Sequence, residues 1–102
     1  MDRIDRDEVV RVLEAVIDVV GGPDTDVSWS GYDDPAEVVA DLRGLSRRVR
    51  PPGPDRGTVR QISLLFAPTG AVQEISISSG WGDEFLGLAD RMDRALGEID
   101  WG

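Results

Sequence analysis

The sequence contains no cysteine, no histidine and no lysine, so all 11 of its basic residues are arginine. Without cysteine there are no disulfides, thiolate zinc sites or cysteine nucleophiles. Without histidine the chain lacks the commonest general base and metal ligand, and without lysine it has no amine for Schiff-base chemistry. This inventory predicts a protein that is not an enzyme and that holds no metal and no cofactor.

Long hydrophobic runs are also missing. The longest uninterrupted apolar stretch is residues 64–67, whereas a membrane span needs roughly 20 such residues. The first eight residues are mostly charged and contain no apolar segment of the kind that a signal peptide requires. We therefore expect a cytoplasmic protein that makes no membrane contact.

Negative charge is in excess, with 20 acidic residues and a net charge of -9. Such a balance disfavours nucleic-acid binding, because that affinity depends largely on neutralising phosphates. The charge is uneven, since residues 42–60 hold six arginines against one acid, Asp55, for a local net charge of +5. The rest of the chain therefore carries -14, and this polarity predicts a basic patch on an acidic body.

Helix signals are clear in three segments. Asp5 and Glu8 have the spacing of a capping box, and apolar residues recur at helical spacing from there to Val20. Asp34, followed by a proline, predicts a second helix start, and that helix must end before the proline-rich residues 51–54. The third apolar stripe consists of Phe85, Leu88, Ala89, Met92, Leu96 and Ile99.

Between residues 58 and 79 the pattern changes to alternation, which is typical of strands. It places Leu64 on the same face as Ile62, and Ile77 on the same face as Ile75. A Pro-Thr-Gly sequence separates the two alternating segments and is typical of a turn.

The order of these elements predicts an α+β fold. We expect one domain, residues 1–102, with about three helices packed on a small antiparallel sheet in a two-layer sandwich. The sheet contains a hairpin formed by residues 58–67 and 71–79, and residues 27–32 add a short, weakly signalled strand.

A calcium-loop pattern is present but out of context. Its matching positions are Asp26, Ser28, Ser30, Gly31 and Glu37. No helix leads directly into the segment, and Pro35 interrupts it. The spacing of Asp34 and Glu37 is explained by a helix cap, so we predict no metal site here.

Arginines form the first candidate binding site. Arg43 and Arg47 lie four residues apart on the second predicted helix, and Arg50 follows next to the proline-rich segment. Guanidinium groups that converge in this way bind phosphate or carboxylate groups. Pairing of these arginines with the many acids of the chain is the competing interpretation.

The second candidate is the glycine-flanked tryptophan before the last helix. If exposed, Trp81 would serve as an aromatic anchor for a partner, because tryptophan is favoured at binding hot spots. Closure of the core by Trp81, with Gly82 and Asp83 forming the turn and the helix cap, is the favoured alternative, because most aromatic residues of a small domain are buried. The acidic residues that would accompany Trp81 in binding a partner are Asp83, Glu84, Asp90 and Asp93.

These features favour recognition over catalysis. The leading hypothesis is a protein-protein interaction module, of inhibitor or immunity type, that binds a basic partner. The alternative is a small-molecule or anion-binding domain that uses the arginines between Arg43 and Arg60 together with the Trp81 junction. A third hypothesis is self-association through a sheet edge, so a monomer and a homodimer both remain open.

Overall fold

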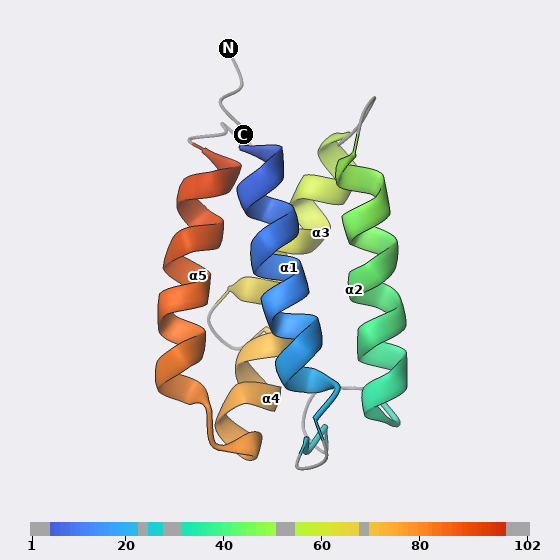
Figure 1. Cartoon of the computed structure of the whole chain (residues 1–102), viewed down its shortest axis with the longest axis vertical. Coiled ribbons are helices and arrows are strands. Elements are labelled where there is room, and N and C mark those ends of the chain that lie inside the picture. The colour runs from blue at the N-terminus through green and yellow to red at the C-terminus, as the bar shows by residue number, and fades with distance from the viewer. Residues whose placement is uncertain (1–4, 23–24, 28–31, 51–54, 68–69, 98–102) are drawn as a thin grey trace.

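The computed structural model describes residues 5–22, 25–27, 32–50, 55–67 and 70–97, and these ranges form five helices (Figure 1). The helices are α1 (Arg6–Val20), α2 (Pro35–Val49), α3 (Arg56–Phe66), α4 (Ala71–Ser79) and α5 (Gly82–Leu96). No strand occurs in the described ranges. The predicted α+β sandwich is therefore wrong, and the fold is a small helical bundle.

The first two helices begin where the sequence predicts. The Asp5 carboxylate accepts the backbone N–H of Glu8 at 3.1 Å, and Asp34 accepts that of Glu37 at 3.2 Å. The capping box at α1 is only half formed, because the backbone N–H of Asp5 donates to the carbonyl of Ala95 at 2.7 Å. This bond joins the start of α1 to the end of α5.

The first predicted strand is α3. Its buried apolar residues Val59, Ile62 and Phe66 follow helical spacing, whereas Leu64 on the opposite side is 61% exposed. Asp55 caps the helix by accepting the Thr58 N–H at 2.7 Å. The apparent alternation arose because Leu64 is an exposed apolar residue, and a segment this short fits both periods.

The second predicted strand is α4, in which Ile75 is fully buried and Ile77 is 61% exposed. The two isoleucines therefore do not share a face. Of the weakly predicted strand 27–32, residues 28–31 lie outside the described ranges, and neither Val27 nor Tyr32 belongs to a strand. The sheet edge through which self-association was predicted does not exist in the described part of the chain.

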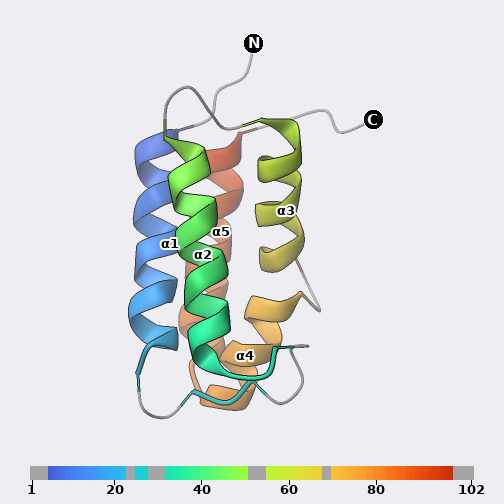
Figure 2. The same cartoon turned by 90° about the vertical axis from the view of Figure 1, so that its right-hand side faces the viewer.

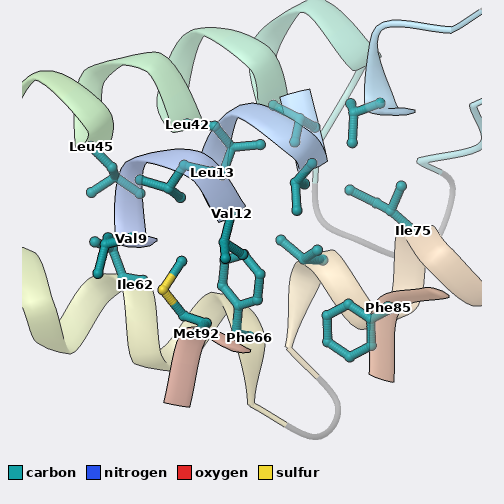
Figure 3. Packing of buried hydrophobic residues seen from close by; sticks show 14 of the residues in the cluster. Val9, Val12, Leu13, Leu42, Leu45, Ile62, Phe66, Ile75, Phe85 and Met92 are labelled. Carbon is teal, nitrogen blue, oxygen red and sulfur yellow. The ribbon is translucent and has the colours of Figure 1, made fainter. Parts of the chain in front are cut away.

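The helices surround one core. In Figure 1, α1 lies between α2 and α5, and Figure 2 shows α3 and α4 following one another along the opposite side of the bundle. All five helices contribute side chains to the apolar interior, as Figure 3 shows. Phe66 and Phe85 stack with ring centroids 6.1 Å apart, which joins α3 to α5.

An ion pair fixes α1 against α5. The guanidinium of Arg91 donates to both carboxylate oxygens of Glu8, at 3.1 and 2.9 Å. The hydrogen bond from Arg91 lowers the pKa of Glu8 below its ordinary value of 4.5. At pH values above the pKa that Glu8 has in the unfolded chain, its ionised carboxylate stabilises the fold. This stabilisation is lost as the pH falls through the lower pKa that Glu8 has in the folded protein.

This linkage predicts a pH-dependent effect of Glu8→Gln. The variant should unfold at a lower temperature than the parent near neutral pH, and the difference should shrink as pH falls below the ordinary pKa of Glu8. Thermal unfolding followed by circular dichroism across this pH range measures the difference. A gap between parent and variant that stays constant down to acid pH would contradict the role of the ion pair.

The single tyrosine of the chain offers a second titration. Tyr32 is partly buried, and its hydroxyl donates to Asp41 on α2 at 2.9 Å. Burial, followed by this hydrogen bond, raises the pKa of Tyr32 to about 12. Tyrosinate absorbance of the folded protein should therefore titrate at about 12, and a midpoint at the ordinary value of 10.0 would contradict the packing of this side chain.

Candidate functional site

The α4–α5 junction brings several of the predicted binding residues together. α4 ends at Gly80, which has a φ of 87° that favours glycine. The backbone N–H of Gly80 donates to Ile77, and that of Trp81 donates to Ser76 at 2.8 Å. This pair of bonds is the Schellman arrangement, which reverses the chain so that α5 begins at once.

Trp81 turns into the core at this junction. It is only 7% exposed, and among the described residues its buried indole Nε1–H has no acceptor within hydrogen-bond distance. Its large apolar area offsets the cost of that unpaired donor, which is about 1–3 kcal/mol. Trp81 therefore closes the end of the core, as the competing interpretation had it, and presents little surface to a partner.

A hollow of about 420 Å³ lies over this closed end of the core. Its lining residues are Ile77, Gly80, Trp81, Gly82, Asp83 and Glu84. The two helices approach closely here, since a Cβ on Gly82 would lie 3.7 Å from Cγ1 of Ile77. The hollow thus combines an exposed aliphatic side chain with two carboxylates and includes no basic residue.

The acidic residues beside the hollow differ in their surroundings. Asp83 and Glu84 are exposed in the first turn of α5, where negative charge also favours the helix dipole. No side chain caps this helix, so the predicted cap by Asp83 is wrong. Farther along α5, Asp90 is paired with Arg94 at 2.7 Å. Asp93 is exposed and forms no ion pair with the described residues.

A second aliphatic side chain extends the apolar surface. Leu86 is 61% exposed and follows Gly82 by one helical turn, so both lie on the same side of α5. Long side chains on a helix lean toward its N-terminus, which directs Leu86 toward Gly82 and hence toward Ile77. We call the lining residues together with Leu86 the acidic hollow.

Sequence reasoning found the acids of this site and missed its aliphatic residues. Ile77 was assigned to a buried strand face, and Leu86 was not singled out. The detectable signal was helical spacing: Val72 and Ile75 fill the buried side of α4 and leave Ile77 on the other.

The predicted arginine site is assembled at a different place. Arg43, Arg47 and Arg50 line a hollow of about 370 Å³ between α1 and α2. The remaining lining residues are Glu14, Ile17, Asp18 and Ser46. This arginine hollow shares no residue with the hollow at the Trp81 junction, so an anion-binding function would use these two regions as separate sites.

Other arginines of the basic segment lie elsewhere. Arg56 and Arg60 are exposed on α3, and Arg48 donates to the side chain of Gln61 at 3.4 Å. The described arginines of the basic segment therefore come from two helices and the residue after α2.

No family model, curated protein or solved structure matches this chain. Within the described ranges, no group of three or more acidic residues is placed to hold a metal ion. Three positions of the calcium-loop pattern, residues 28, 30 and 31, lie outside those ranges. None of the described helices has the length and apolar character to cross a membrane.

Proposed function

We propose that this chain is a protein-binding module whose acidic hollow receives a basic partner. The observation that carries the proposal is the 61% exposure of Ile77 inside a hollow edged by Asp83 and Glu84. Aliphatic surface provides the affinity of such a contact, and the carboxylates select the sign of the partner's charge. A cytoplasmic location and a role in inhibiting a basic protein are parts of the same proposal.

The shape of the hollow favours a helical partner segment with two aliphatic residues. Ile77 on α4 and Leu86 on α5 are both exposed, and each would contact one of the two aliphatic residues of the partner. Arginine or lysine residues beside the inserted group would lie near Asp83 and Glu84. A second copy of this chain is a poor occupant, because its own hollow presents the same negative charges.

A designed peptide pair tests this proposal. One helical peptide carries leucines on one face and arginine and lysine on the other, and its counterpart carries glutamate in place of the basic residues. Calorimetry should show that the basic peptide binds and that the acidic peptide does not. Ile77→Ser should weaken that binding by about tenfold or more, because it removes the aliphatic contact at the centre of the hollow.

Leu64→Ser is the matched control for this variant, because Leu64 is also 61% exposed but lies on α3 outside the hollow. It should leave the affinity within about twofold of the parent. Equal losses in Ile77→Ser and Leu64→Ser, or no binding of the basic peptide at about 1 mM, would overturn the proposal.

Charge is tested by a second pair of variants. Asp83→Asn combined with Glu84→Gln should weaken binding of the basic peptide by about tenfold at low salt. Asp7→Asn combined with Asp33→Asn removes the same charge from exposed sites outside the hollow and should have little effect. Equal losses in the two double variants would mean diffuse attraction to an acidic protein, which is a different function.

A further inference from the structure

The arginine hollow has two walls of opposite charge. α1 and α2 run antiparallel beside one another (Figure 1), and their facing sides meet at this hollow. Arg43 and Arg47 come from α2 and Arg50 is the residue that follows this helix, whereas Glu14 and Asp18 come from α1. The partly buried Ile17 and the buried Ser46 also line the hollow and add an apolar group and a hydroxyl between the charged residues.

These walls do not neutralise each other through close ion pairs. The one ion pair across the hollow joins Arg50 to Glu14 at 3.9 Å, and both side chains are more than half exposed. An exposed pair at that distance contributes little to stability. Arg43, Arg47 and Asp18 form no ion pair with any described residue.

Elsewhere in the chain, close ion pairs do form. Arg91 binds Glu8 with two hydrogen bonds, and Arg94 approaches Asp90 to 2.7 Å. Arginines of this strongly acidic protein therefore form close ion pairs where the helices place a carboxylate within reach. Two guanidinium groups that face a solvent-filled hollow with no close carboxylate remain able to bind an oxyanion from solution.

The volume and charge of the hollow define the ligand. A volume of about 370 Å³ falls within the range of sites that hold small molecules. Glu14 and Asp18 weaken the binding of a simple anion, and the three arginines weaken the binding of a simple cation. A molecule with an oxyanion at one end and an ammonium group at the other complements both walls.

We propose that the hollow between α1 and α2 binds a small zwitterion, with its phosphate or carboxylate at Arg43 and Arg47 and its ammonium group at Asp18. The apolar side of Ile17 contacts the short carbon chain that joins the two groups. This site is separate from the acidic hollow, so either one can exist without the other.

Thermal unfolding at constant ionic strength tests the ligand class. Phosphoethanolamine is a zwitterion with a phosphate group, and β-alanine is a zwitterion with a carboxylate group. Inorganic phosphate supplies the negative charge alone, and ethanolamine supplies the positive charge alone. A zwitterion should raise the unfolding temperature in proportion to site occupancy, with a dissociation constant at least about tenfold below that of the better single-charge probe. Comparison of the two zwitterions identifies the preferred oxyanion.

Three variants locate the binding. Arg47→Gln should weaken zwitterion binding by about tenfold, and Asp18→Asn should remove the advantage of the zwitterion over inorganic phosphate. Arg60→Gln changes an exposed arginine outside the hollow and should leave binding unchanged. All three positions are exposed on helices, so circular dichroism should show that each variant remains folded.

Two results would overturn this proposal. One is equal stabilisation by inorganic phosphate and phosphoethanolamine, with β-alanine inactive, which would show that the ammonium group contributes nothing. The other is zwitterion binding that persists in Arg47→Gln, or no stabilisation by any probe up to about 10 mM.

Discussion

Ile62→Ala is expected to lower the free energy of unfolding by about 2–5 kcal/mol, because it leaves a cavity at a fully buried position of α3. Leu64→Ala, two residues away, should change it by less than about 0.5 kcal/mol, because that side chain is already 61% exposed. In a strand the two side chains would share a face and both substitutions would be costly.

Chemical denaturation of the two variants measures this contrast. The informative quantity is the ratio of the two losses in the free energy of unfolding. It shows directly whether the buried side chains of this segment follow the period of a helix or that of a strand. Comparable destabilisation by both substitutions would contradict the all-helical fold and restore the hairpin interpretation.

Gly70→Ala is expected to destabilise the protein by about 1–3 kcal/mol. A Cβ at this position would lie 2.7 Å from the carbonyl oxygen of Leu65 and 2.9 Å from that of Ala67, and closer still to that of Leu64. Backbone oxygens cannot move aside as a flexible side chain can, so the backbone at Gly70 must shift away from the end of α3. The effect should appear as a lower midpoint of chemical denaturation.

Gly87→Ala provides the control for this substitution. Gly87 is exposed within α5, and a Cβ there would meet no atom within 4 Å. Alanine should stabilise the protein by up to about 1 kcal/mol, because it favours helix over the unfolded chain. A Gly70→Ala variant as stable as Gly87→Ala would contradict the geometry of the α3–α4 turn.

Three of the five described helices were predictable because several signals agreed. α1 combines a cap at Asp5 with an apolar stripe that ends at Val20, and α2 combines Asp34, a proline in the first turn and a buried stripe. α5 has a stripe of more than three turns. Long stripes cannot be mistaken for strands, because the two periods diverge over such a length.

α3 and α4 were misassigned for a physical reason. Both are short, and each exposes one large aliphatic residue, Leu64 or Ile77, where alternation expects a buried one. Tertiary packing against the long helices determines their conformation more than local preference does. The cap at Asp55 and the chain reversal at Gly80 were the local signals for helices in this region.

The charge of the candidate site could be predicted from the sequence, but its shape could not. Asp83 and Glu84 were chosen because they follow Trp81, and they do edge a hollow. The sequence left two interpretations of Trp81, because it shows that a residue is large and aromatic but not which way it faces, and the structure buries this side chain. Arg43 and Arg47 line the same hollow, as their spacing predicts, because residues four apart share a helix face.

An NMR titration of the labelled protein with the basic leucine-bearing peptide tests the central claim most directly. We expect the amide signals of residues 77–86 to shift first and most, and we expect these shifts to disappear in Ile77→Ser. Shifts spread evenly over the acidic outer faces of α1 and α5, or centred on the arginine hollow, would contradict a binding site at the α4–α5 junction.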